Sequence, residues 1–324
     1  MGAEDPSRGS RDAPALFGPV TRDLAAVESE LRRSIEADPP EVAEPMADLF
    51  AAGGKRIRPA LVLLAARCGG TYDPARLLPA ATAVELTHAA TLVHDDVIDR
   101  SPTRRGRPTI AAGLGDEPAI VIGDFYFAKA YEHAARTGVP EVVDVLARTV
   151  MAICAGEVRQ QAIRYRYSTG VDEYMRRIEA KTAMLLAACC DIGALLGGLG
   201  GTQRKALEAY GRELGLAFQI ADDVLDYTAT EGEVGKPIGH DVREGFATLP
   251  LMLASIALED GKRLSEDESG HVVDAVRKSD GPRLALEQAR KHADGARSQL
   301  LALDGGDAND ALASLADYVV SRKL

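Results

Sequence analysis

The sequence predicts an all-α fold, built as a single large helical bundle. Strand signals are scarce, because runs of alternating β-branched residues hardly occur. Alanine, leucine, glutamate and arginine dominate the composition, and all four favour helices. Glycine and proline interrupt the sequence at intervals, but no proline- or serine-rich linker divides it. One helical domain over residues 19–324 is therefore expected.

The helices are expected between these interruptions. In chain order they cover residues 20–37, 40–52, 57–68, 75–99, 118–136, 140–165, 171–198, 202–227, 247–259, 267–278, 281–302 and 307–321. Residues 80–93 and 183–199 are apolar on nearly every side, as is typical of helices that are surrounded by others. Apolar residues also make up a large share of the helices at 118–136 and 140–165. They either face their own core or form a dimer interface.

The N-terminal segment differs from the rest of the chain. Residues 1–18 are polar and contain Pro6 and Pro14, so they predict a disordered tail. This segment lacks the apolar core of a signal peptide. No apolar run reaches the roughly 18–20 residues needed to span a bilayer. The sequence therefore predicts no membrane span.

The charge and the cysteines exclude several classes of protein. With 38 Lys+Arg against 49 Asp+Glu, the formal net charge is −11, which argues against nucleic acid and anionic membrane surfaces as partners. No two cysteines form a CxxC pair, and most lie in apolar, helix-like runs. This excludes a zinc ribbon or a disulfide scaffold and favours a reducing cytoplasm. The cysteines are Cys68, Cys154, Cys189 and Cys190.

Two aspartate clusters are the strongest local signal. Asp95-Asp96-Val97-Ile98-Asp99 is echoed by Asp222-Asp223-Val224-Leu225-Asp226, and each cluster follows an apolar stretch. The outer aspartates of each cluster are four residues apart, so they share one helical face and repel each other. Bound divalent cations such as Mg²⁺ would compensate for that repulsion. The alternative is a pair of solvated helix ends, but two matches are harder to dismiss than one.

Basic residues near these clusters are suited to anions. Lys55 and Arg58 flank the start of the helix expected at 57–68, where free N–H groups favour an anion. Arg104 and Arg105 follow the first aspartates, and arginine is well suited to bidentate phosphate contact. The alternatives are an ordinary helix–helix turn and a charge-balancing loop.

Three further positions stand out by their surroundings. Lys181, with Thr182, opens an apolar run, and Lys236 follows the second aspartates. His88 precedes Asp95 by two helical turns, so it faces either the acidic end or the core. Acidic clusters for Mg²⁺, basic groups for phosphates and an apolar interior together suit a molecule with a diphosphate head and a hydrocarbon tail.

These residues resemble a known family, the trans-isoprenyl diphosphate synthases (polyprenyl synthetases). The resemblance runs from about residue 20 to the C-terminus. Its motifs are GGKRIRP at 53–59, HDDVIDRSPTRRGRPT at 94–109, KTA at 181–183, FQIADDVLDY at 218–227 and GKPIGHDVREGFATLPL at 235–251. The resemblance implies an all-α bundle of the isoprenoid synthase type, with a central active-site cavity, and a homodimer.

The resemblance also implies roles for the site residues. Asp95 and Asp99, supported by Asp96, would bind Mg²⁺ on an allylic diphosphate. Asp222, Asp223 and Asp226 would hold the remaining metal, giving three Mg²⁺ per active site. The allylic diphosphate would be bound by Arg104, Lys181 and Lys236. Isopentenyl diphosphate would be held by Lys55, Arg58, His88 and Arg105, with Phe218 and Gln219 beside its hydrocarbon part. Thr182 would lie close to the reacting carbons.

By this resemblance the protein is a prenyltransferase. It would ionise an allylic diphosphate, join the allylic cation to isopentenyl diphosphate and release pyrophosphate. The alternatives are a class I terpene cyclase, a non-catalytic subunit of a heteromeric synthase and a purely structural bundle. A cyclase needs no isopentenyl site, and non-catalytic subunits typically lose aspartates that this chain retains.

Product length is expected to depend on the residues just below the first aspartates. Thr87, Ala90 and Thr91 are not bulky, whereas in the family bulky aromatic residues there stop growth at short chains. A product longer than twenty carbons is therefore expected, and Ala90→Tyr is expected to shorten it. The alternative is geranylgeranyl or farnesyl diphosphate, with a floor formed from the neighbouring helix by Met151, Ile153 and Cys154.

Overall fold

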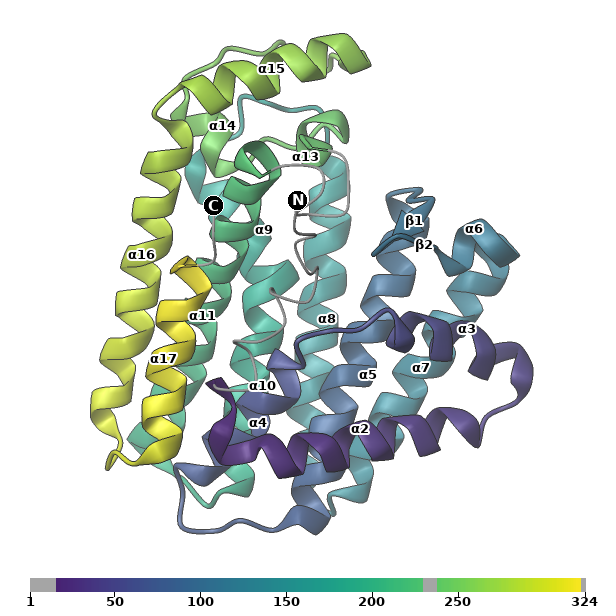
Figure 1. The fold of residues 1–324 in the computed structure, drawn as a ribbon, viewed down its shortest axis with the longest axis vertical. Helices are drawn as coiled ribbons and strands as arrows, with labels where there is room; N and C mark the ends of the chain where they lie inside the picture. The colour runs from purple at the N-terminus through teal and green to yellow at the C-terminus, as the bar shows by residue number, and fades with distance from the viewer. Residues whose placement is uncertain (1–15, 230–237, 322–324) are drawn as a thin grey trace, which may run out of the picture.

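A computed structural model of the chain describes residues 16–229 and 238–321, which form a helical bundle (Figure 1). The helices are η2 (Gly18–Val20), α2 (Thr21–Glu36), α3 (Pro40–Ala51), α4 (Ile57–Arg67), α5 (Pro74–Ile98), α6 (Ile110–Leu114), α7 (Asp116–Arg136), α8 (Pro140–Ala162), α9 (Val171–Ile178), η3 (Glu179–Ala183), α10 (Met184–Leu196), α11 (Gly201–Thr228), α13 (His240–Arg243), α14 (Leu249–Leu253), α15 (Glu266–Lys278), α16 (Gly281–Gln299), η4 (Leu300–Ala302) and α17 (Asp307–Ser321). Within the described ranges, one hairpin pairs strands β1 (Thr103–Arg104) and β2 (Arg107–Pro108). The predicted all-α fold is confirmed.

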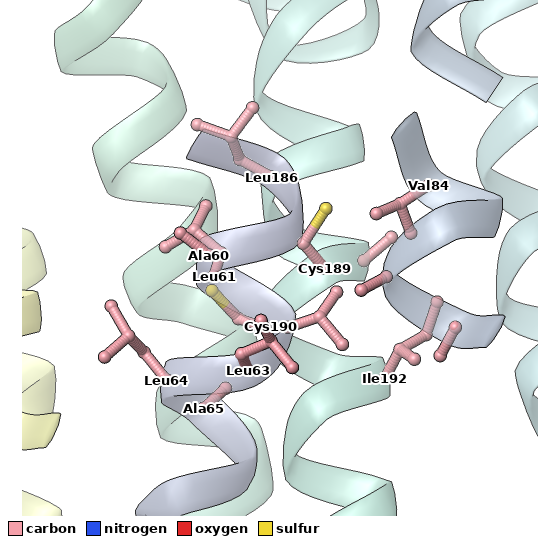
Figure 2. Packing of buried hydrophobic residues seen from close by; sticks show 14 of the residues in the cluster. Ala60, Leu61, Leu63, Leu64, Ala65, Val84, Leu186, Cys189, Cys190 and Ile192 are labelled. Carbon is pink, nitrogen blue, oxygen red and sulfur yellow. The ribbon is translucent and has the colours of Figure 1, made fainter. Parts of the chain in front are cut away.

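The core is built around helix α4. Every residue from Ala60 to Ala66 is fully buried. Cys189 and Cys190 of α10 pack against this helix, together with Val84 of α5 (Figure 2). A helix can be apolar on all sides only where other helices surround it, so the two runs predicted to be interior are interior.

Helices α5 and α11 carry the two aspartate clusters toward the same end of the bundle. Asp73 caps the N-terminus of α5 by accepting a hydrogen bond from the backbone N–H of Ala75 at 3.0 Å. The C-terminal ends of both helices lie toward the upper end in Figure 1, where the β1–β2 hairpin and α13 also lie. This end of the bundle therefore receives the charged residues of both motifs.

The helix predicted over 247–259 is wrong outside residues 249–253. The structure has only α14 there, and Ser255 has a φ of +55°. Asp260 accepts hydrogen bonds from the backbone N–H and the hydroxyl of Ser168. The backbone N–H of Gly261 donates to the carbonyl of Tyr165 at 2.8 Å. These contacts to the segment before α9 fix the chain after α14 as a loop.

Three local features differ from the expectation. The helix expected at 118–136 begins at Asp116 and is preceded by the short helix α6. Gly115, with a φ of +95°, separates the two helices. The β1–β2 hairpin stands where no strand was expected. Of the predicted tail over 1–18, residues 16–18 are described, and Phe17 packs into the core at 5% exposed.

Among the described residues, none of the helices combines the length and the apolar character needed to cross a membrane.

Candidate active site

A cavity of about 1320 Å³ opens among α5, α8, η3, α11 and the hairpin. Aspartates of both clusters line it, which brings two segments far apart in the sequence to one site. The lining aspartates are Asp95, Asp99, Asp222, Asp223 and Asp226. Asp96 is 3% exposed and is not among the lining residues.

Lys181 and Thr182 stand on a π-helical turn rather than on an ordinary α-helix. The run expected as one helix over 171–198 is divided by η3, which joins α9 to α10. Single π turns inside helices occur often at functional sites. Glycines on both sides permit close contact, because a Cβ on Gly156 would lie 2.5 Å from the Cβ of Ala180 and a Cβ on Gly215 would lie 2.4 Å from the Cα of Ala183. Helices α8 and α11 therefore hold this turn from two sides.

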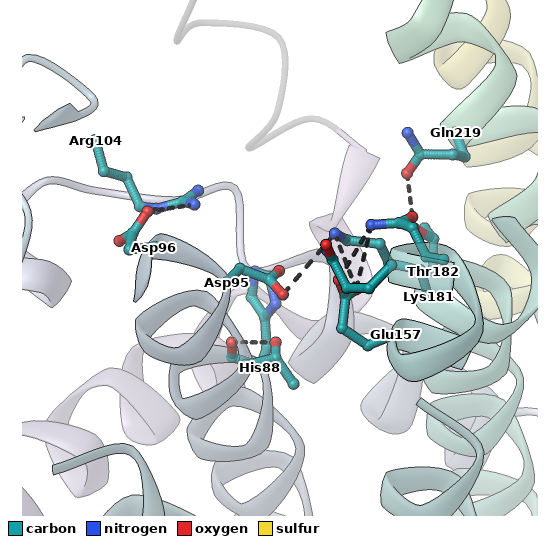
Figure 3. A network of polar contacts seen from close by, with 11 residues as sticks. His88, Asp95, Asp96, Arg104, Glu157, Lys181, Thr182 and Gln219 are labelled. Carbon is teal, nitrogen blue, oxygen red and sulfur yellow. Dashed lines mark hydrogen bonds and ion pairs between the residues drawn. The ribbon is translucent and has the colours of Figure 1, made fainter. Parts of the chain in front are cut away.

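Lys181 lies between two carboxylates. Its Nζ is 3.8 Å from Oδ1 of Asp95 and 3.4 Å from Oε2 of Glu157 on α8 (Figure 3). Glu157 is held in turn by the amide groups of Gln160 and Gln161, at 3.2 and 2.9 Å. Burial alone would lower the pKa of Lys181, but the carboxylates raise it, so the ammonium stays charged.

Sequence reasoning missed Glu157. It lies in a helix expected only for its apolar share, and no motif marked it. The available signal was an acidic residue directly after Gly156 in a mostly apolar helix, which becomes informative only once the packing of α8 against η3 is known.

The first aspartate cluster is tied to the hairpin. Arg104 of β1 donates from Nε to both carboxylate oxygens of Asp96, at 2.9 and 3.0 Å, and its Nη2 lies 2.7 Å from Oδ1 (Figure 3). Arg104 lines the cavity, as the sequence predicts, while its guanidinium is anchored to the end of α5. A planar guanidinium can satisfy a carboxylate in this way more completely than an ammonium can.

Burial raises the pKa of two carboxyls that line the cavity, Asp95 and Asp99. Burial raises the pKa of Asp95 to about 6. The charge of Lys181 opposes this shift, and the nearby carboxylates of Glu157 and Asp99 add to it. Burial also raises the pKa of Asp99. A raised pKa means that burial disfavours the charged form of these carboxyls. A ligand that brings positive charge into the cavity would stabilise that charged form.

The second cluster is organised by a chain of hydrogen bonds. Thr182 donates from Oγ1 to Oε1 of Gln219 at 2.6 Å (Figure 3), and Gln219 donates from Nε2 to Oδ1 of Asp223 at 2.8 Å. Tyr174 of α9 donates to the other oxygen of Asp223 at 2.7 Å. Asp226 accepts hydrogen bonds from two backbone N–H groups at the start of α13. Two sequence-predicted residues, Thr182 and Gln219, are thus in direct contact.

The predicted basic residues line the same cavity, as do Phe218 and Gln219. Lys55, Arg58, His88 and Arg105 all line it. Lys55 donates to the hydroxyl of Tyr318 on α17 at 2.7 Å. Burial, together with the guanidinium groups of Arg58 and Arg105, lowers the pKa of His88, so this imidazole is neutral at physiological pH. Lys236 lies outside the described residues.

The residues considered for product length are divided by the structure. Thr91 and Ile153 line the cavity. Thr87 and Ala90 are fully buried and are not among its lining residues. Met151 is 62% exposed, and Cys154 is also exposed. The two lining residues are thus the better placed of this set to meet a hydrocarbon tail.

A family profile described as "Polyprenyl synthetase" matches residues 39–272. This chain belongs to that family. It is 40% identical over 95% of its length to "Heptaprenyl diphosphate synthase component 2" of Geobacillus stearothermophilus, covering 98% of that protein. It is 36% identical over 93% of its length to the protein of the same name from Bacillus subtilis, covering 88% of it.

Solved structures agree with the family assignment. A polyprenyl synthase from Caulobacter crescentus, complexed with calcium and isoprenyl diphosphate, matches with a TM-score of 0.91 and 36% identity, over 96% of this chain and 98% of that one. Polyprenyl diphosphate synthases are prenyltransferases, and membership of the family assigns this chain to that enzyme class.

Proposed function

We propose that this prenyltransferase condenses isopentenyl diphosphate with an allylic diphosphate in a Mg²⁺-dependent reaction that releases pyrophosphate. The observation that carries the proposal is that one cavity is lined both by aspartates of the two clusters and by basic residues. Lys181 lies beside Asp95, and Lys55, Arg58 and Arg105 line the same cavity. A diphosphate that arrives with metal suits the aspartates, and a diphosphate bound without metal suits the basic residues.

The aspartates that line the cavity are a donor set that fits Mg²⁺. Over residues 16–229 and 238–321, no three His, Cys, Asp or Glu side chains form a group that could hold a metal ion by themselves. Mg²⁺ is usually bound by one or two carboxylates together with waters and substrate phosphates, so such a group is not required. The ligands would be Asp95, Asp99, Asp222, Asp223 and Asp226, with three ions per site. When bound, Mg²⁺ would supply positive charge that stabilises the departing diphosphate.

The protein's own cations would stabilise the same developing charge. Lys181 and Arg104, with Lys236, would bind the allylic diphosphate as its C–O bond breaks and leaves an allylic cation. Lys55, Arg58, His88 and Arg105 would hold isopentenyl diphosphate so that its double bond meets that cation. Thr182 would lie close to the reacting carbons. Gln219, which is hydrogen-bonded to Thr182, would lie with Phe218 beside the hydrocarbon part of isopentenyl diphosphate. This addition would give a new carbocation, which would form the product double bond by losing a proton from a neighbouring carbon to the released pyrophosphate.

The product proposed is a polyprenyl diphosphate longer than twenty carbons. Two relatives are named for a heptaprenyl product, which supports this length over geranylgeranyl or farnesyl diphosphate. Thr91 and Ile153, which line the cavity, are not aromatic and would leave room for a long tail.

The oligomer proposed is a homodimer in the cytoplasm. Helices α7 and α8 leave large apolar side chains exposed, including Val121 at 64% and Met151 at 62%. A second copy would cover such surfaces. Both relatives are named as components, so a heteromeric assembly is the second candidate. All four cysteines are free thiols, which suits a reducing compartment.

The decisive experiment supplies the purified chain with Mg²⁺, isopentenyl diphosphate and each of three allylic primers, followed by mass analysis of the products. Polyprenyl diphosphates are the expected result. Hydrocarbon from a primer alone would instead identify a cyclase. Turnover that requires an added partner protein would support the heteromeric assembly and contradict the homodimer.

A further inference from the structure

Arg56 has an unusual backbone between two predicted ligand-binding residues. It precedes α4, and its φ of 52° and ψ of 36° place it in the left-handed region. Residues other than glycine adopt this conformation rarely, and it persists only where surrounding contacts enforce it. Lys55 lies directly before Arg56, and Arg58 lies two residues after it. The conformation of Arg56 therefore helps to set the directions of both.

The guanidinium of Arg56 is held by carboxylates from two helices. Its Nη1 donates to Oε1 of Glu85 on α5 at 3.0 Å, and its Nε donates to Glu28 on α2. It also lies over the ring of Phe50, 5.2 Å from the centroid. The Glu85 side chain is 7% exposed and that of Glu28 is 41% exposed, so Glu85 is the better shielded anchor.

Glu85 is a buried carboxylate beside the basic residues of the cavity. It lines that cavity one helical turn before His88. Among the residues that the structure describes, no hydrogen-bond partner reaches its second oxygen, Oε2, which is buried, and the same holds for the buried Nε of Arg58. A buried, partly unsatisfied carboxylate is costly, so its position next to Arg56 and Arg58 calls for a specific role.

We propose that Glu85 is a positioning residue of the isopentenyl diphosphate pocket. It anchors Arg56 in its left-handed conformation and thereby directs Lys55 and Arg58 into the cavity. This inference rests on the proposed function, because it assumes that these two residues bind that substrate. The competing role is simple charge balance, in which Glu85 only weakens the attraction of the pocket for a diphosphate.

Glu85→Gln separates the two roles, because it removes the charge and keeps the shape. Positioning predicts that KM for isopentenyl diphosphate rises about tenfold, while kcat and KM for the allylic substrate stay within about twofold. Charge balance predicts that KM for isopentenyl diphosphate falls. Glu30→Gln is the matched control, since Glu30 on α2 also pairs with an arginine, Arg136, at 2.9 Å and does not line the cavity.

A binding measurement removes the dependence on turnover. Calorimetric titration of isopentenyl diphosphate in Mg²⁺-free buffer is expected to give about tenfold weaker affinity for Glu85→Gln than for the wild type. An unchanged or tighter affinity would overturn the inference. Failure of the wild type to turn over isopentenyl diphosphate would instead contradict the proposed function. In that case inorganic pyrophosphate serves as the probe, and the affinities of the variant and the wild type for it are compared.

A double-mutant cycle tests whether Glu85 acts through Arg56. In an Arg56→Gln background, Glu85→Gln should have little further effect on affinity, because the contact is already lost. Additive effects would overturn the inference. If Glu85→Gln melts early by circular dichroism, Arg56→Lys provides the second variant, since lysine keeps the charge but cannot bridge Glu28 and Glu85 as a guanidinium does. It should show the same selective rise in KM, and a wild-type KM would count against positioning.

Discussion

Arg104 and Asp96 form a bidentate ion pair that joins the β1–β2 hairpin to the end of α5, with Nε–O distances of 2.9 and 3.0 Å. The middle aspartate of the first cluster therefore differs in role from Asp95 and Asp99, which line the cavity. Its carboxylate holds an arginine that itself lines the cavity. This explains how a cluster of like charges can be stable at one helix end.

Asp96→Asn is expected to loosen the hairpin. The change removes charge-assisted hydrogen bonds and should lower the free energy of unfolding by about 1.5–3 kcal/mol, measured by denaturant titration. Asp48→Asn is the control, because Asp48 meets Arg107 of the same hairpin at 3.6 Å with its side chain 82% exposed. That variant should be near neutral. Equal losses in both variants would contradict a special role for the Asp96 pair.

Glu157→Gln is expected to raise KM for the allylic substrate. Without the Glu157 charge, Lys181 would lose the closer of the two carboxylates that orient it, so its ammonium would be less well placed for a diphosphate. The expected rise is roughly fivefold, equivalent to about 1 kcal/mol, with KM for isopentenyl diphosphate unchanged. Glu141→Gln on the same helix removes an exposed pair with Arg204 and should leave both constants unchanged. Steady-state kinetics that show equal effects on both substrates would refute this explanation.

Thr91→Phe is expected to shorten the product. Thr91 lines the cavity, so a ring there would meet the growing tail, and chromatography of the products measures the change. Thr87→Val is the control, because Thr87 is buried away from the cavity lining and bonds to the carbonyl of Ala83. Ala90→Tyr is a poorer probe, since overpacking a fully buried position costs about 1–3 kcal/mol. An unchanged product from Thr91→Phe would show that position 91 does not limit the length of the growing tail.

Asp95 is expected to make the ligand-free protein less stable as pH rises. Its pKa is raised, mainly by burial, from 3.8 to about 6, so folding favours its neutral form. Its contribution to stability is complete below pH 3.8 and is lost as pH rises through about 6. Asp95→Asn lacks this dependence. As pH rises from 3.8 to about 6, its melting temperature should therefore increase relative to that of the wild type. Parallel melting curves would be inconsistent with the raised pKa.

Val121→Glu is expected to dissociate the proposed homodimer. A buried carboxylate at the centre of an apolar interface is costly, and sedimentation should then report half the mass. Leu301→Glu is the control, because Leu301 is more exposed, at 86%, but lies beyond α16 and far along the chain from α7. A dimer that survives Val121→Glu would place the interface elsewhere.

The helical architecture could be predicted because its causes are local. Apolar runs such as 183–199 can only be interior helices, and Gly53, Gly69 and Gly170 interrupt the chain between helices. The hairpin was missed because its strands are two residues long and depend on left-handed Arg105 and Gly106. The end of the predicted 247–259 helix failed because Tyr165 and Ser168, nearly a hundred residues earlier, hold that segment.

The site could be predicted in part for the same reason. The aspartates and Lys181 stand in short motifs, so their spacing carried the information. Glu85 and Glu157 lie in helices whose apolar pattern predicts only that the helices are buried. Their partners, Arg56 and Lys181, are distant in sequence. Such residues become visible only when packing brings separate helices together.

The π turn at η3 holds one residue more than the i→i+4 bonding of an α-helix would. Each residue rotates a helix by about 100°, so deleting one residue from 179–183 would turn all that follows relative to α9. Lys181 and Thr182 would leave the cavity wall, or the apolar faces of α10 would leave the core. The length of this five-residue segment is therefore constrained as tightly as its composition.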